Sequence, residues 1–179
     1  MPKERLKFEN SIRKLGFDPR DLKYIVVTHG HFDHIWGCNE LRELSGAKVY
    51  AYKEEEEVLL SARLNVSAGV DRPYTVKADY LFEDNEEFEL CGIKGKVIAT
   101  PGHTKGSCCY YFEEAGLLVS GDTLFQESVG RTDLPTGSGG TLGRSIKERL
   151  LCLPGETKVY PGHGDSTTIS YEAKYNPFC

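Results

Sequence analysis

The sequence predicts an α/β (α+β) fold in a single domain spanning residues 1–179, and three observations lead to this prediction. Short apolar segments of strand length alternate with segments whose apolar residues have helical spacing. Turns rich in glycine and proline separate these segments. Three times, a strand runs directly into a loop that contains histidine, and loops at the ends of strands are where α/β scaffolds place functional residues.

The first helix and the first strand follow from the N-terminal apolar pattern. Leu6, Ile12 and Leu15 supply the apolar positions of a helix that should end at Gly16, a favourable residue just after a helix. Residues 24–28 then form a continuous apolar run. Such a run predicts a strand that is buried on both faces.

A second helix and a second strand follow. Residues 35–44 have apolar side chains at helical spacing and predict a helix, and residues 48–52 predict a strand. Residues 54–57 are four consecutive glutamates that begin another helix. Acidic side chains suit the first turn of a helix, so we interpret the four glutamates as a solvated turn without function.

From residue 79 onward the pattern changes mainly to strands. We expect strands at 80–82, 87–90, 94–100, 107–112, 117–121 and 157–160, and a helix at 145–153. Cys108 and Cys109 are consecutive in one of these strands and should face opposite sides of the sheet.

Composition excludes several classes of function. The chain has 22 basic and 27 acidic residues and no lysine or arginine block, which argues against nucleic-acid binding. Its apolar runs are too short to span a membrane, and the charged N-terminus has no signal-peptide pattern, so we expect a cytoplasmic protein. The six cysteines form no CxxC pair and share no loop with a histidine, which favours reduced, structural thiols over metal ligands.

All five histidines lie in short loops beside glycine, proline or aspartate. A single histidine is usually an ordinary surface or core residue, but neutral imidazole is a strong ligand for zinc or iron. Five of five in such loops therefore indicate a metal site. The candidate ligands are His29, His31, Asp33, His34, His103, Asp122 and His163.

Four of these ligands fall within six consecutive residues and would crowd a single tetrahedral ion, which indicates two ions. Two metals about 3.5 Å apart can share a water whose pKa falls toward neutrality, which supplies hydroxide. We expect two divalent ions, with zinc favoured and iron or manganese as alternatives. The predicted assignment places His29, His31 and His103 on one ion, Asp33, His34 and His163 on the other, and Asp122 between them.

The motifs resemble those of the metallo-β-lactamase superfamily. The resemblance rests on THGHFDH at 28–34, TPGHT at 100–104, SGDT at 120–123 and PGHG at 161–164. The segments LF at 124–125, GRTDL at 130–134 and YNPF at 175–178 are similar to the short glyoxalase-II-like branch, the hydroxyacylglutathione hydrolases. The resemblance covers nearly the whole chain and implies an αββα sandwich, in which two mixed sheets lie between outer helices.

Two departures from the family pattern are expected. Members of the family usually begin with several strands before the first histidine motif, and this chain is short at its N-terminus. We expect those strands to be lacking, which would expose a sheet edge and an apolar face. We also expect no C-terminal helical domain of the kind that binds glutathione in long-form glyoxalase II.

The resemblance implies hydrolysis of a thioester, such as an S-lactoylglutathione-like or other hydroxyacyl thioester, by a hydroxide between the two ions. Asp33 would orient this nucleophile as well as bind a metal. Arg131 is a candidate for binding a substrate carboxylate, with an internal ion pair to Asp133 as the alternative.

Two other functions stay open. One is an iron-dependent persulfide dioxygenase, whose family shares the ligand set and the Gly-Arg-Thr-Asp motif but uses a single iron. The other is an inactive fragment of a metallo-hydrolase. In each active case the partner is a small molecule rather than nucleic acid or membrane, and a homo-oligomer is an open alternative.

Overall fold

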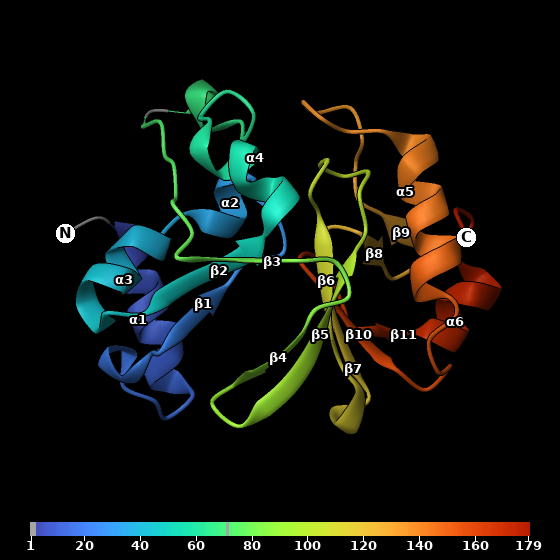
Figure 1. Ribbon diagram of the computed structural model, residues 1–179, viewed down its shortest axis with the longest axis horizontal. Coiled ribbons are helices and arrows are strands. Elements are labelled where there is room, and N and C mark those ends of the chain that lie inside the picture. The colour runs from blue at the N-terminus through green and yellow to red at the C-terminus, as the bar shows by residue number, and fades with distance from the viewer. Residues whose placement is uncertain (1–2, 71) are drawn as a thin grey trace.

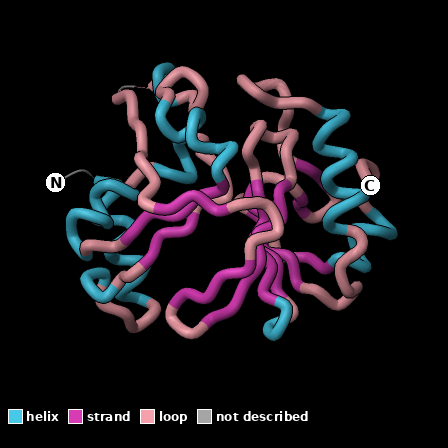
Figure 2. Tube along the Cα trace, viewed as in Figure 1, coloured by secondary structure: helices cyan, strands magenta, loops and turns pink. Residues whose placement is uncertain are grey.

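Two β-sheets pack face to face, and helices cover the outer face of each (Figure 1). The computed structural model describes residues 3–70 and 72–179, with side chains from Phe8 onward, so the predicted role of the Leu6 side chain lies outside the described residues. Figure 2 shows the strands enclosed between helices on two sides. This arrangement confirms the predicted αββα sandwich.

The smaller sheet is parallel and lies beside the N-terminal helices. Its strands, in spatial order, are β1 (Tyr24–Val26), β2 (Lys48–Tyr52) and β3 (Tyr80–Phe82). Helices α1 (Lys3–Lys14) and α3 (Cys38–Ser45) lie outside this sheet in Figure 1. One apolar cluster between these layers contains Val49, Ala51, Ile35 and Leu59.

The prediction of a strand buried on both faces at 24–28 is wrong. Strand β1 ends at Val26, and all three of its residues are only partly buried. The reason is that, in the described sheet, β1 is an edge strand whose strand neighbour is β2. Full burial begins at Val27, which is 5% exposed and leads into the histidine-rich loop.

The predicted helix at 35–44 is two helices. Helix α2 (Phe32–Ile35) ends before Gly37, and α3 begins after it. Gly37 has φ +108°, and a Cβ there would lie 2.7 Å from the Phe8 ring of α1. A glycine is required at this break because the backbone is left-handed and the neighbouring ring is in contact with it.

The larger sheet has six strands in the order β11-β10-β7-β6-β5-β4. Strand β10 runs parallel to β7, and the other neighbours are antiparallel. The strands are β4 (Glu87–Leu90), β5 (Ile93–Ala99), β6 (Cys108–Phe112), β7 (Leu117–Gly121), β10 (Lys158–Pro161) and β11 (Thr167–Thr168). A separate pair consists of β8 (Leu124–Phe125) and β9 (Ser128–Val129).

Helices on the outer face of the larger sheet enclose a second core. Helix α5 (Gly139–Ser145) continues as the π-helical turn η5 (Ile146–Leu150), so the helix predicted at 145–153 begins six residues early. Helix α6 (Ile169–Tyr175) completes this layer. The short helices elsewhere are η1 (Pro19–Asp21), η2 (Lys53–Glu55), α4 (Glu56–Leu60), η3 (Ser67–Gly69) and η4 (Glu113–Ala115).

A third core lies between the two sheets and joins them. Phe82 of β3 packs there with Val97, Cys108 and Tyr110 of the larger sheet. Cys109 instead packs in the outer core, which confirms that the two adjacent cysteines face opposite ways. None of the described helices is long and apolar enough to cross a membrane.

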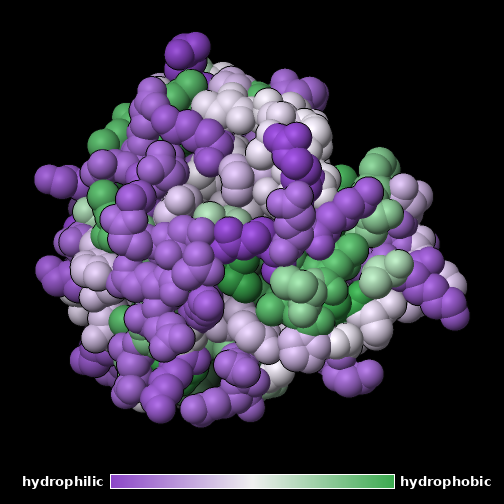
Figure 3. All heavy atoms as spheres, turned by 45° about the vertical axis from the view of Figure 1, so that its right-hand side comes forward, coloured by the Kyte–Doolittle hydropathy of each residue, from purple (hydrophilic) through white to green (hydrophobic). Residues whose placement is uncertain are grey.

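Most of the surface shown in Figure 3 is hydrophilic, with hydrophobic side chains gathered in one area right of centre.

Candidate metal centre

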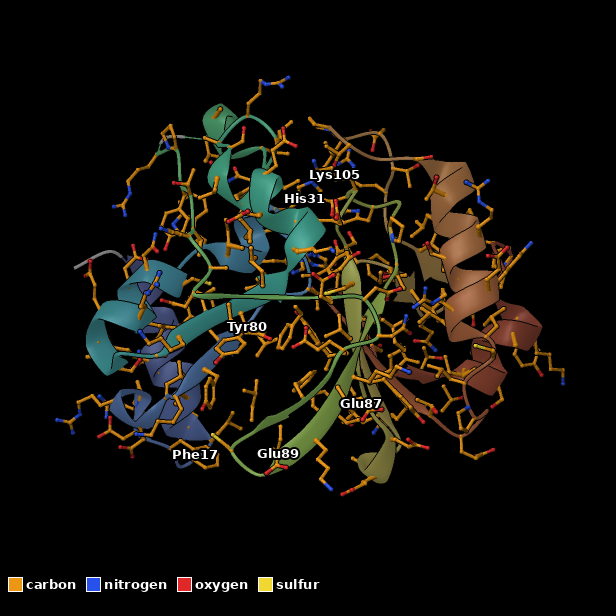
Figure 4. The ribbon with its side chains drawn as sticks, viewed as in Figure 1. Phe17, His31, Tyr80, Glu87, Glu89 and Lys105 are labelled. Carbon is orange, nitrogen blue, oxygen red and sulfur yellow. The ribbon has the colours of Figure 1, made fainter. Side chains whose placement is uncertain are left out.

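The histidine-rich loop leaves β1 where the two sheets meet, and it is fixed to both. On the smaller sheet, the Val27 N–H donates to the Tyr50 carbonyl. On the larger sheet, the Cys108 N–H donates to the Thr28 carbonyl, and the Tyr110 hydroxyl donates to the Val27 carbonyl at 2.8 Å. The start of the loop therefore has a defined position before any ligand binds. Figure 4 shows His31 and Lys105 at this end of the molecule, opposite Phe17 and Glu89.

The first cluster of candidate ligands, called here the buried group, is His29, His31 and His103. Their side chains are almost inaccessible, because the residues are 1%, 4% and 2% exposed. His103 Nε2 lies 2.8 Å from His31 Nδ1 and 3.2 Å from His29 Nε2. Three ring nitrogens thus converge on one point, although they come from loops after β1 and β5.

The second cluster, called here the exposed group, is Asp33, His34 and His163. His163 Nε2 lies 3.1 Å from His34 Nε2 and 3.3 Å from Asp33 Oδ2. The side chains of Asp33 and His163 are 44% and 56% exposed, while His34 is 15% exposed. The donor atoms are as close together as in the buried group, but solvent reaches them.

Asp122, directly after β7, lies between the two groups. Its carboxylate oxygens are 3.6 Å from His103 Nε2, 3.4 Å from His34 Nε2 and 3.6 Å from His163 Nε2. One side chain therefore faces nitrogens of both groups, as a bridging ligand must. The structure brings together all seven residues singled out from the sequence, and their assignment to individual ions stays a prediction.

Burial and charge give the histidines different proton affinities. Burial lowers the pKa of His29 well below its usual value, lowers that of His31 to about 4, and also lowers that of His103. Burial acts in the same direction on His34, but the neighbouring Asp122 carboxylate outweighs it and raises the pKa of His34. The buried group is therefore neutral near pH 7, the protonation state in which imidazole binds a metal.

Neighbouring groups orient the buried imidazoles. His103 Nδ1 lies 2.7 Å from the Arg131 carbonyl, an acceptor only, so Nδ1 carries the proton and donates, leaving the Nε2 lone pair free. His31 Nε2 is buried without a hydrogen-bond partner, while its Nδ1 faces His103. The nitrogen lone pairs of the three imidazoles point toward one another, and there are too few protons for all of them to be hydrogen-bonded. Such a set of lone pairs can instead bind a cation. The residues therefore fit a divalent metal.

Glu55 contradicts the prediction that the four glutamates at 54–57 form a solvated turn. It is 1% exposed and accepts three hydrogen bonds: from the Gly30 N–H at 2.6 Å, the Thr104 hydroxyl at 2.8 Å and the Gly106 N–H at 3.1 Å. Burial raises the pKa of Glu55 to about 7, although these bonds lower it. The other three glutamates keep at least part of their surface in solvent.

A hollow of about 500 Å³ opens beside both groups. Besides candidate ligands, it is lined by Ser128, Arg131 and five apolar side chains: Phe32, Val66, Phe125, Val129 and Leu134. The Arg131 guanidinium pairs with Asp133 through two bonds of 2.7 Å, and both side chains are mostly exposed. This is the ion pair considered as the alternative to substrate binding.

The family model and the most similar proteins described below indicate the same family. Residues 1–163 match the family described as the metallo-beta-lactamase superfamily. The chain is 41% identical to the "Probable metallo-hydrolase YqgX" of Bacillus subtilis, over 96% of this chain and 81% of that protein. It is 32% identical to the "Hydroxyacylglutathione hydrolase GloC" of Haemophilus influenzae, over 95% of this chain and 82% of that protein.

Solved structures agree. A crystal structure described as "BLEG-1 B3 metallo-beta-lactamase" matches with a TM-score of 0.89 and 36% identity, over 97% of this chain and 83% of that chain. A second, "TTHA1623 in a di-iron-bound form", matches with a TM-score of 0.83 and 36% identity, over 97% of this chain and 84% of that chain. Together with the cluster of histidines and aspartates, these matches indicate a site for divalent metal.

Proposed function

This chain belongs to the metallo-beta-lactamase superfamily, and from that premise we propose that it is a binuclear hydrolase of thioesters. The buried group, with His29, His31 and His103, would hold one ion. The exposed group would hold the other, and Asp122 would contact both. Bound divalent ions would supply hydroxide near neutral pH and neutralise the charge that develops on a carbonyl oxygen.

The observation that carries this proposal is the lining of the hollow. Among its described residues, every histidine and every carboxylate is also a candidate metal ligand. In the described lining, the side chains that could protonate a departing group are the same ones that would bind metal, which favours a leaving group that is stable as an anion. A thiolate meets this condition because thiols have pKa values near about 8.5, whereas amine and alcohol leaving groups need a proton.

Asp33 is placed to act on the nucleophile. Its carboxylate is partly exposed at the mouth of the hollow, with Oδ2 3.3 Å from His163 Nε2. A carboxylate in this position can accept a hydrogen bond from an attacking water and orient it. Asp33 would thus act both as a ligand and as the residue that positions the nucleophile.

Arg131 and the apolar lining define the proposed substrate pocket. Phe125 and Leu134 would contact the acyl chain, and Arg131 would bind a carboxylate if its pairing with Asp133 opens. The similarity to the GloC protein of Haemophilus influenzae, whose name describes hydrolysis of a hydroxyacyl thioester, supports this substrate class.

The test is hydrolysis by chain reconstituted separately with zinc, iron and manganese. S-lactoylglutathione, a short hydroxyacyl thioester of another thiol, the matching oxygen ester and a chromogenic cephalosporin would be compared, with Asp33→Asn as the variant. We expect thioester turnover at least roughly 100-fold above the oxygen ester, which is about 2.7 kcal/mol of barrier. Faster hydrolysis of the cephalosporin than of the thioesters would contradict the proposal and indicate a β-lactamase. Oxygen uptake with a persulfide by chain that holds one iron would contradict it in favour of a persulfide dioxygenase.

A further inference from the structure

Glu55 is a buried carboxylate that forms no ion pair with any side chain in the described part of the chain. All three groups that donate to it are neutral: two backbone N–H groups and the Thr104 hydroxyl. The nearby Lys105 ammonium instead pairs with the exposed Glu57. Burying a carboxyl group without a counterion is costly, so the presence of Glu55 here calls for an explanation in its surroundings.

The residues that bond Glu55 supply that explanation. Gly30 lies between His29 and His31 in the chain, and Thr104 follows His103 directly. The two carboxylate oxygens divide between the loops, since Oε1 bonds Gly30 and Oε2 bonds Thr104 and Gly106. One side chain therefore holds both loops that carry the buried group.

The backbone around Gly106 shows how closely the second loop approaches. A Cβ at Gly106 would lie 2.2 Å from the Glu55 nitrogen and 2.3 Å from the Glu54 carbonyl carbon. Only glycine permits this contact, which brings the 104–106 segment within reach of the carboxylate. The links from the larger sheet to the loop start, from the Cys108 N–H to the Thr28 carbonyl and from the Tyr110 hydroxyl to the Val27 carbonyl, lie before the first histidine.

We propose that Glu55 is a positioning residue of the metal centre: its carboxylate ties the His29–His31 loop to the His103 loop, so that their three ring nitrogens face one divalent ion. This inference rests on the metal centre of the proposed function but not on its substrate. Glu55 bonds Gly30 and Thr104, the chain neighbours of the three ligands, and its carboxylate, when ionised, also favours a bound cation. Glu55 touches neither the ion nor the substrate.

The test is metal binding by the metal-free chain, with no substrate present. Co²⁺ would be titrated against a competing chelator, and the visible absorption of the bound ion would be recorded, for wild type, Glu55→Gln and Glu54→Gln. Glu55→Gln has nearly the same shape, but its NH₂ must face an N–H donor or the Thr104 hydroxyl. Glu54→Gln removes the same charge from an exposed neighbour and is the matched control.

We expect Glu55→Gln to bind the first equivalent of Co²⁺ roughly 10- to 100-fold more weakly and to change its absorption bands, the usual effect of losing an outer partner of metal ligands. Glu54→Gln should stay within about twofold of wild type. The inference is overturned if Glu55→Gln matches wild type in both affinity and spectrum. A loss of thermal stability without a change in either would also overturn it, because it would reveal a purely structural role.

A second variant covers the case in which Glu55→Gln fails to fold. Thr104→Val keeps the carboxylate and removes one of the three bonds, so we expect a several-fold loss of affinity for the first Co²⁺. An unchanged affinity in folded Thr104→Val would then contradict the inference. Wild-type chain that binds two ions but hydrolyses no thioester would refute the substrate proposal and leave this test intact.

Discussion

The two halves of the metal centre use similar donors in opposite surroundings. The buried group has three imidazoles at most 4% exposed, oriented by the Arg131 carbonyl and held by loops that Glu55 connects. In the exposed group, the side chains of Asp33 and His163 are 44% and 56% exposed. Preorganised, desolvated ligands lose little freedom on binding, whereas exposed ones must be ordered. We therefore expect one tight ion and one weaker, solvent-facing ion beside the substrate hollow.

The largest expected effect comes from removing one ligand from each half. His103→Ala should prevent binding of the tight ion, whereas His163→Ala should retain one ion per chain. Thioester hydrolysis should fall roughly 1,000-fold or more in His103→Ala, since an ion contributes several kcal/mol to the transition state. Elemental analysis of both variants checks this. If His163→Ala lost both ions and His103→Ala kept one, the ranking of the two halves would be reversed.

The next largest expected effect is the loss of metal when Asp122, which lies between the buried and the exposed group, is replaced. Asp122→Ala should lose more metal than Asp133→Ala, because the Asp122 carboxylate faces nitrogens of both groups while Asp133 pairs with the exposed Arg131. We expect Asp122→Ala to hold at most about one ion after desalting and Asp133→Ala to hold two, since a bridging carboxylate serves both cations. Equal metal content in the two variants would contradict the bridging assignment.

A smaller effect is the pH dependence of the metal-free chain. Burial lowers the pKa of His29 and brings that of His31 to about 4, so between about pH 6.5 and 4 the unfolded chain binds protons at these two residues that the folded chain excludes. Their contribution to the free energy of unfolding should therefore decrease as pH falls through this window, by at most about 1.4 kcal/mol per pH unit for each group. His34 and Glu55, whose pKa values are raised, act in the opposite direction.

Denaturant unfolding between pH 4 and 7 measures this dependence, and His31→Gln is the comparison. The variant should show a shallower decrease than wild type. Parallel curves for the two proteins would mean that His31 does not contribute to the loss of stability in acid.

Much of the site could be predicted because its signals are local in the sequence. All seven candidate ligands lie in the parts of the chain that follow apolar strand segments, as the run from Val27 to His34 illustrates. Strands at 48–52, 80–82, 87–90 and 117–121 have the predicted bounds, since their limits coincide with turns or changes of apolar pattern. These features can be predicted because they depend on residues that are close together in the sequence.

The errors arose where distant segments meet. Glu55 resembles its three acidic neighbours, and only the close approach of the loop at Gly106 buries it. Gly37 breaks a helix that apolar spacing alone would continue, because the Phe8 ring of another helix lies against it. Residues 24–26 are less buried than their apolar run predicts, because such a run does not reveal whether a strand lies at an edge. Each error depends on a tertiary contact that local pattern does not contain.

The most direct test of the central claim is a stepwise zinc titration of the metal-free chain, with thioester hydrolysis measured at each step. We predict two ions per chain, a first that binds tightly and a second that binds more weakly, with turnover rising to its full value as the second ion binds. A single ion per chain at saturation, or two equal sites with no thioester turnover, would contradict a binuclear thioester hydrolase with one buried and one exposed half.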